Sequence, residues 1–137
     1  MSDIGTALRA HLLSVSQVTD LLGSRFYPDA LQQGCELPAA VYYLISAVEE
    51  PSLSTRLEIT HARIQIDCYA STRAAANGLA QLIRDQLDCH RGAWNSVDVL
   101  GVTVTSGLRY GVQQKADGGD ERQYIASRDF LVSFRDP

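Results

Sequence analysis

Residues 61–88 read H-A-R-I-Q-I-D-C-Y-A-S-T-R-A-A-A-N-G-L-A-Q-L-I-R-D-Q-L-D and contain two hydrophobic periods in succession. In the first half, apolar and polar residues alternate, which is the period of a strand with one buried face. The residues expected on the buried face are Ala62, Ile64, Ile66, Cys68 and Ala70. Those expected on the opposite, polar face are Arg63, Gln65, Asp67 and Tyr69.

The second half changes to helical spacing and predicts a helix from Thr72 to about Asp88. Ser71 or Thr72 stands where the helix needs an N-cap, because a hydroxyl oxygen can accept a free backbone N–H of the first turn. The apolar stripe expected to face the sheet consists of Ala75, Ala76, Leu79, Leu82, Ile83 and Leu87.

The segments around this junction are also patterned. Two helical pieces, a Pro-bearing extended connector with few ladder bonds, and three further strands are expected. In chain order they are helix Ser2–Val15, short helix Val18–Leu22, connector Ser24–Pro38, strand Ala39–Val48, strand Val97–Gln113 and strand Arg122–Arg135. Residues 49–58 would form the long tip of a hairpin.

The two C-terminal strands each have an apolar face. The face expected for residues 97–113 consists of Leu100, Val102, Val104, Leu108, Tyr110 and Val112. In the last strand, Phe130, Val132 and Phe134 should point inward, and Arg128 breaks their alternation, which suggests a bulge or a register change.

The predicted order is therefore helix, strand, strand, helix, strand, strand. The predicted fold class is α+β, with an antiparallel sheet of about four strands and the N-terminal helix and one long helix packed on one face. A chain of 137 residues fits one domain, residues 1–137.

Composition narrows the possible functions. Hydrophobic residues make up 45% of the chain, which suits a globular domain, and no apolar run approaches a membrane span. The net charge is -4 and Lys115 is the only lysine, whereas a duplex-DNA binder usually has a basic stripe. Three widely spaced cysteines favour neither a disulfide framework nor a zinc site, and indicate synthesis in a reducing cytosol. Cys68 is expected to be a core residue.

No catalytic constellation is recognisable, and no cofactor or metal is predicted. Three histidines are scattered along the chain. The expected roles are a core-edge or surface position for His11, a surface ion pair for His61 and a helix C-terminus for His90. Asp117 and Asp120 flank a Gly-Gly turn, but the loop lacks the ligand count of a calcium site.

Two readings remain open for the polar face of the strand at residues 61–70. It is either a solvated sheet face or a face that packs on a neighbouring subunit, for which Tyr and Arg are favoured residue types. The adjacent strand would present Tyr42, Leu44 and Val48 on one side and Val41, Tyr43 and Ile45 on the other. Only one of these sides can lie under the chain's own helices.

Four stretches follow one another along the chain: V-T-D-L-L-G-S-R-F-Y-P-D-A-L, L-P-A-A-V-Y-Y-L-I-S, the junction from R-I-Q-I-D-C-Y-A-S-T into its helix, and the C-terminal D-F-L-V-S-F-R. Together they resemble the tail-completion proteins of long-tailed phages, also called tail terminators or head–tail joining proteins. Their order and spacing cover most of the chain.

The resemblance implies a structural, non-enzymatic role in the virion, at the junction of tail and neck, after synthesis in the bacterial host cytoplasm. Such proteins form a ring, commonly of six copies, on the head-proximal end of the tail tube. The ring ends tube polymerisation and docks to the head connector, and DNA passes through its lumen without specific binding. The implied partners are further copies of the chain, the tail tube protein and the connector or neck protein, with no membrane.

Three groups of candidate contact residues follow from this resemblance. The subunit interface would use Tyr42, Tyr43, Arg63, Gln65, Asp67 and Tyr69. The tube or connector contact would use Glu49, Glu50, Ser52, Leu53, Ser54 and Arg56. The lumen or rim would use Asp117, Asp120 and Glu121.

Other functions predict other features. A neck or connector adaptor of the same particle would have a similar sequence pattern. A small α+β nucleic-acid-binding module would expose aromatic residues flanked by basic ones, as Tyr69 and Arg63 could do. An enzyme would need titratable groups that converge in a cleft.

Overall fold

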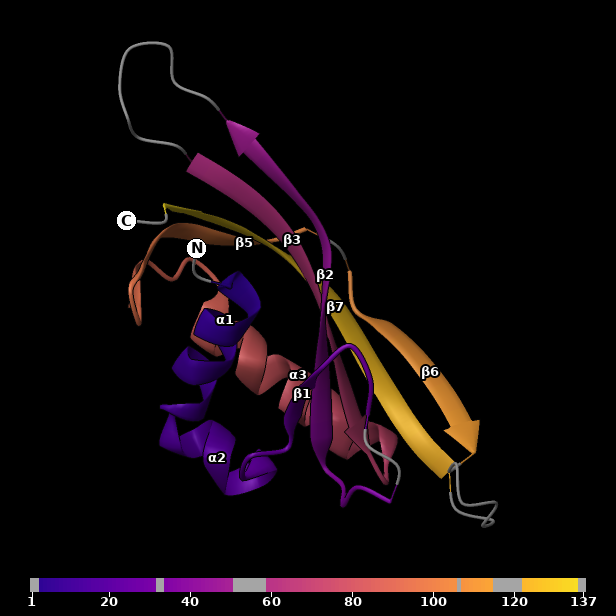
Figure 1. The fold of residues 1–137 in the computed structure, drawn as a ribbon. Helices are drawn as coiled ribbons and strands as arrows, with labels where there is room; N and C mark the ends of the chain where they lie inside the picture. Colours follow the sequence, from indigo (N-terminus) through magenta and orange to yellow (C-terminus); the bar gives the residue numbers. More distant parts are fainter. Residues whose placement is uncertain (1–2, 32–33, 51–58, 106, 115–121, 136–137) are drawn as a thin grey trace.

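A computed structural model describes residues 3–31, 34–50, 59–105, 107–114 and 122–135. Three helices and seven strands lie within these ranges (Figure 1). In chain order they are α1 (Ile4–Leu13), α2 (Ser16–Leu22), β1 (Phe26–Pro28), β2 (Ala39–Glu50), β3 (Ile59–Ala70), α3 (Arg73–Leu87), β4 (Gly92–Trp94), β5 (Val97–Val104), β6 (Arg109–Gln114) and β7 (Arg122–Arg135).

The predicted fold class is wrong in the make-up of its sheet. All seven described strands form one sheet in the order β1-β2-β3-β7-β5-β4, and β6 also pairs with β7, beside β5. The sheet is mixed, because β1 runs parallel to β2, and it curls so that its β4 end contacts α1 (Figure 1). The four-strand antiparallel prediction missed three strands and counted one N-terminal helix where the structure has two.

The central junction is confirmed. The five residues of β3 predicted to be buried are at most 2% exposed. Thr72 caps α3, since its hydroxyl oxygen accepts the N–H of Ala75 at 3.1 Å. Of the predicted stripe, Ala75 is exposed and Leu82 half-buried, while Ala80 is buried in their place. This helix packs on β3 and β7 and forms one wall of the core.

The N-terminal helices close the other end of the core. Asp3 caps α1 by accepting the N–H of Gly5 at 3.1 Å, and Gly23 ends α2 with a positive φ of 57°. Gly5 has no side chain for a packing reason: a Cβ there would lie 2.8 Å from the ring of Tyr42. The Tyr42 ring in turn meets Phe26 edge-to-face, with centroids 4.9 Å apart.

The connector between α2 and β2 is more ordered than predicted. Phe26–Pro28 pairs with Ala40–Tyr42 as β1, although two prolines lie in this segment. Two arginines stabilise its loops, because Arg9 donates to the carbonyl of Phe26 at 2.9 Å and Arg25 donates to that of Pro38 at 2.9 Å.

The alternating segment at residues 97–113 is two strands and not one. β5 has a bulge between Val99 and Gly101, so its buried residues are Val97, Val99 and Val102, while Leu100 is only half-buried. A bulge inserts one residue and reverses the side to which later residues point, which overturns the single predicted face. The prediction for the last strand is confirmed, since Phe130, Val132 and Phe134 are all buried.

Strand β2 is buried at its start and exposed over the rest of its length. Its first four residues are buried on both faces, next to β1, while every residue from Leu44 to Glu50 is exposed. A bulge between Leu44 and Ser46 shifts the register against β3. Leu44 therefore pairs with Ile64 on the helix side, and Val48 pairs with His61 on the helix-free side. The predicted common face of Leu44 and Val48 is wrong for this reason.

Candidate functional site

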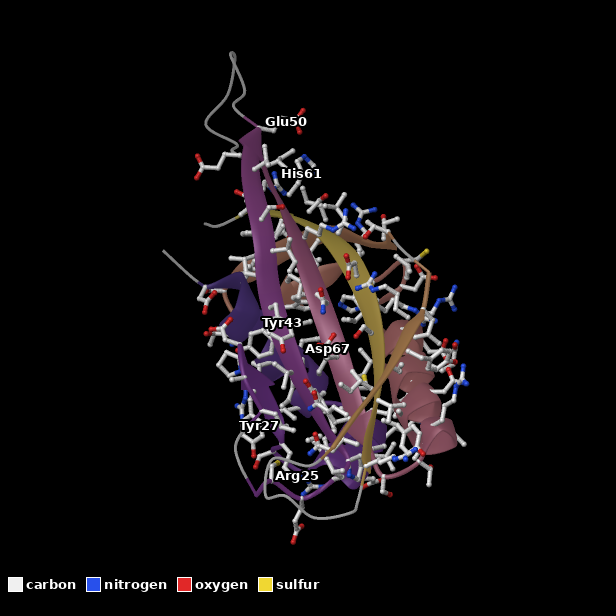
Figure 2. The ribbon with its side chains drawn as sticks, turned by 90° about the vertical axis from the view of Figure 1, so that its right-hand side faces the viewer. Arg25, Tyr27, Tyr43, Glu50, His61 and Asp67 are labelled. Carbon is white, nitrogen blue, oxygen red and sulfur yellow. The ribbon has the colours of Figure 1, made fainter. Side chains whose placement is uncertain are left out.

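The three helices lie on one side of the sheet and leave the other side open (Figure 1). Figure 2 views this helix-free face, with Tyr43 and Asp67 near its middle and Glu50 and His61 at its upper end. The strand register brings β2, β3, β7 and β6 together there, side by side. The polar residues that alternate along β3 are therefore part of a four-strand surface.

An aspartate from β7 joins two arginines across this surface. Asp129 Oδ2 accepts from Arg63 Nη2 at 2.9 Å and from Nε at 3.1 Å, and Oδ1 accepts from Arg109 Nη2 at 2.7 Å. Burial alone would raise the pKa of Asp129, but the hydrogen bonds from Arg109 and Arg63 outweigh it and hold the pKa below its usual value. The carboxylate thus ties β3 and β6 to β7.

Replacing Asp129 with Asn should lower the free energy of unfolding by about 1–3 kcal/mol, because two arginines lose a charge-assisted acceptor that is itself buried. Urea unfolding at pH 7 measures the change. Asp98→Asn is the matched control: Asp98 pairs with Arg135 at 2.8 Å, but it is half exposed, so its loss should cost about 0–1 kcal/mol. Equal losses for both variants would show that burial of Asp129 does not strengthen its pairs.

Most predicted interface side chains on this face bind one another. Asp67 Oδ1 accepts from Gln65 Nε2 at 2.8 Å and from Ser127 Oγ at 2.6 Å, and Asp67 is buried. Tyr69 is also buried and hydrogen-bonds Tyr43; burial first, and then Tyr43, raises the pKa of Tyr69. Of the six predicted residues, Tyr43, Arg63 and Gln65 are the ones partly accessible on this face.

The sixth predicted residue, Tyr42, is elsewhere. It lies in register with Ile66, on the helix side of the sheet, and is buried in the core against Phe26. The sequence pattern placed Tyr42 and Tyr43 on opposite faces of this strand and did not show which face the helices cover.

The upper end of the β2–β3 hairpin holds a small polar network. His61 Nε2 lies 2.9 Å from Glu50 Oε2, and His61 Nδ1 lies 2.7 Å from Ser133 Oγ. Glu49 and Glu50 are exposed at the end of β2. The remaining tip predictions (Ser52, Leu53, Ser54, Arg56) and the lumen predictions (Asp117, Asp120, Glu121) fall outside the described residues.

Sequence reasoning did not select, as candidate site residues, the exposed apolar residues at two edges of the sheet. Leu44, Ile45 and Val48 in β2 are each about half exposed or more, and so are Tyr110 and Val112 in β6. The signal was present in the nearly all-apolar stretch A-A-V-Y-Y-L-I-S-A-V, which predicts either a strand covered on both faces or a strand with one face against another subunit. Within one copy, only residues 39–42 are covered on both faces.

The potential metal ligands of the described residues do not gather into a site. Among them, no group of three His, Cys, Asp or Glu side chains could hold a metal ion, and Cys35, Cys68 and Cys89 are free thiols. Cys68 is buried, as predicted for a core residue. No helix in the described ranges is both long and apolar enough to cross a membrane.

A ring cluster joins α1 to the segment after α3. His11 stacks on Trp94 with centroids 5.0 Å apart, and His90 lies 4.4 Å from His11. Burial, and then the proximity of His90, lowers the pKa of His11. The folded protein therefore favours the neutral form of His11.

This cluster should make the protein less stable in mild acid. Because the folded-state pKa of His11 lies below its value of 6.5 in the unfolded chain, the unfolded chain binds the proton more readily, and stability falls as the pH drops below about 6.5. The measurement is the free energy of unfolding at pH 8, 7, 6 and 5 for the native chain and for His11→Phe, which keeps a ring against Trp94. The difference between the two proteins should change between pH 7 and 5 in favour of the variant; parallel curves would contradict this account.

Comparison with known proteins supplies independent information. A family model described as "Tail completion protein gp17" matches residues 6–109. A chain in the solved structure "Virion of native gene transfer agent (GTA) particle" superposes with a TM-score of 0.63 over 96% of this chain and 94% of that one. Their sequences are 14% identical, so this similarity concerns the fold. No curated protein sequence matches the chain.

Proposed function

The chain belongs to the family of tail-completion proteins of phages, whose model matches more than half of its length, and from this premise we propose that it caps the head-proximal end of the tail tube as a ring. The family resemblance read from the sequence is thus confirmed. The protein is a structural component of the virion. In the proposed role, copies of the chain assemble on the last layer of the tube, stop its growth and provide the surface to which the head connector binds.

The match over residues 6–109 carries this proposal, and the shape of the domain supports it. The β2–β3 hairpin projects beyond the helices (Figure 1), with Glu49 and Glu50 exposed at the end of β2. A projecting hairpin can reach a neighbouring protein without disturbing the core, so we assign the tube or connector contact to this end of the molecule.

The charge of the chain suits a lumen through which DNA passes. With a net charge of -4 and one lysine, the assembled ring would not hold the like-charged nucleic acid by general electrostatic attraction. We therefore propose that DNA passes through the ring without being retained by charge.

Electron microscopy of particles made with and without this chain tests the role. A tail terminator predicts tubes of uncontrolled, greater length and no joined heads when the chain is absent, with both defects repaired when it is supplied. Tubes of normal length that fail to join heads would instead show a neck adaptor and overturn the terminator role. Images of the finished particle should show a ring at the tube end that faces the head.

A further inference from the structure

One edge of the sheet is open for most of the length of β2. Strand β1 pairs only with Ala40–Tyr42, where Ala40 N–H donates to Arg25 O and Asp29 N–H donates to Tyr42 O, both at 3.0 Å. Alternate residues of a strand direct their backbone groups to the same side, so Leu44 continues this outward series. Within the described residues, no strand pairs with this side of β2 beyond Tyr42.

The open edge is also apolar. Leu44 and Ile45 are about half exposed and Val48 is 62% exposed. Exposed edges of natural sheets usually carry charges or prolines or are covered, because a free apolar edge recruits another strand. The segment from Leu44 to Val48 contains no charged residue and no proline, so its composition fits an edge that is covered in the assembled protein.

On the side of the sheet opposite β2, strand β6 forms a second edge that also exposes apolar residues. Among the described strands, β6 pairs only with β7, and two of its apolar side chains, Tyr110 and Val112, are about half exposed. The guanidinium of Arg73 lies 4.1 Å above the Tyr110 ring, and Arg109 begins the strand. This edge therefore combines apolar surface with positive charge, whereas the end of β2 carries Glu49 and Glu50.

We propose that these two edges pair between neighbouring copies of the chain, so that the β2 edge of one copy adds to the β6 edge of the next. The proposal rests on the ring-forming function proposed above and identifies the surfaces that build the ring. Two different edges give a head-to-tail contact, which closes into a ring when the rotation from copy to copy completes a full turn; pairing of identical edges would stop at a dimer.

The strand directions agree with this pairing. β2 is antiparallel to β3, β3 to β7 and β7 to β6, so β2 and β6 run in opposite directions within one chain. When the next copy continues the sheet with its helices on the same side, its β6 must be antiparallel to β2. This orientation brings Glu49 and Glu50 toward the end of β6 that holds Arg109 and Arg73, where opposite charges meet.

Cysteine cross-linking tests the pairing directly. Ala47 and Val112 both point to the helix side of the sheet, because they are in register with Ala62 and Tyr124, and both are exposed. In a background with Cys35→Ser and Cys89→Ser, the double variant Ala47→Cys/Val112→Cys is treated with a short bis-maleimide, which tolerates a small register difference. Most of the protein should appear as a ladder of covalent multimers that ends at the size of the ring.

Three control proteins and one assembly measurement make the outcome decisive. The single variants Ala47→Cys and Val112→Cys should remain uncross-linked, and Leu21→Cys/Val112→Cys, with an exposed residue on α2, should give no ladder. Dimers from Ala47→Cys alone would show β2 paired with β2 and overturn the proposal.

Electron microscopy of the same samples separates this proposal from the proposed function. Rings without a ladder from the double variant would overturn the edge pairing and leave the ring standing. A protein that stays monomeric both alone and with purified tail tubes would overturn the ring and the edge pairing together.

Discussion

Replacing Phe130 with alanine should lower the free energy of unfolding by about 3–5 kcal/mol, a large part of the stability of a domain of this size. Phe130 is 1% exposed and stands on β7 in register with Ile64 of β3 and Val104 of β5. Its ring therefore fills the core where β3, β5 and β7 meet. Removing the ring leaves a cavity that the sheet cannot close, because β7 is held by a paired strand on each side. Chemical unfolding followed by circular dichroism measures the loss.

The next residue along β7 provides the control. Leu131 points to the helix-free side and is half-buried, so Leu131→Ala should cost only roughly 1 kcal/mol. Similar losses for the two variants would mean that the helix-free face is packed as tightly as the core, which contradicts the division of the sheet into a buried and an open face.

The alternation of buried and exposed residues along the strands made the centre of the fold predictable from sequence. In β3 and α3, the buried residues and the cap all lie within one short stretch, and the local period decides which side faces the core. Ile64, Ile66 and Leu79 are buried as predicted because no bulge interrupts β3 and no tertiary contact competes with the pattern.

The strand count could not be predicted in the same way. β1 and β4 have three residues each, too few to show a period, and β1 exists only because the first part of β2 lies beside it. The bulge or register change predicted near Arg128 is absent: β7 keeps a regular register with β3 there, and only its other neighbour changes, from β6 to β5. Such pairings depend on residues far apart in the chain.

Bulges limited the prediction of the candidate site. One inserted residue in β2 moves Val48 to the face opposite Leu44, and no sequence period records where an insertion of this kind occurs. The ion pair between Asp129 and Arg63 was also missed, because the two residues are 66 positions apart in the sequence and no local pattern connects them. The predicted polar face exists, but the structure shows that its side chains bind one another and that the uncovered apolar surface lies at the strand edge.

Because the uncovered apolar surface lies at the strand edge, the assembly experiment with the largest expected effect changes a residue of that edge. Replacing Val48 with glutamate should raise the dissociation constant between copies roughly 10-fold, because the charged side chain replaces apolar surface that would pack beside β6 of the next copy. Val48 is 62% exposed in one copy, so the free energy of unfolding should hardly change. Sedimentation velocity measures the loss of the oligomer, and complementation of particles that lack the chain measures the loss of joined heads and tails.

Leu21→Glu is the matched control, since Leu21 is 42% exposed on α2 and lies on neither edge. If any added charge weakened assembly, both variants would fail alike; if the β2 edge lies at the interface, only Val48→Glu should fail. A Val48→Glu protein that still forms rings and completes tails would place Val48 outside every contact in the particle. The exposed apolar edge would then be a tolerated surface, protected from aggregation by the bulge that bends it away from other strands.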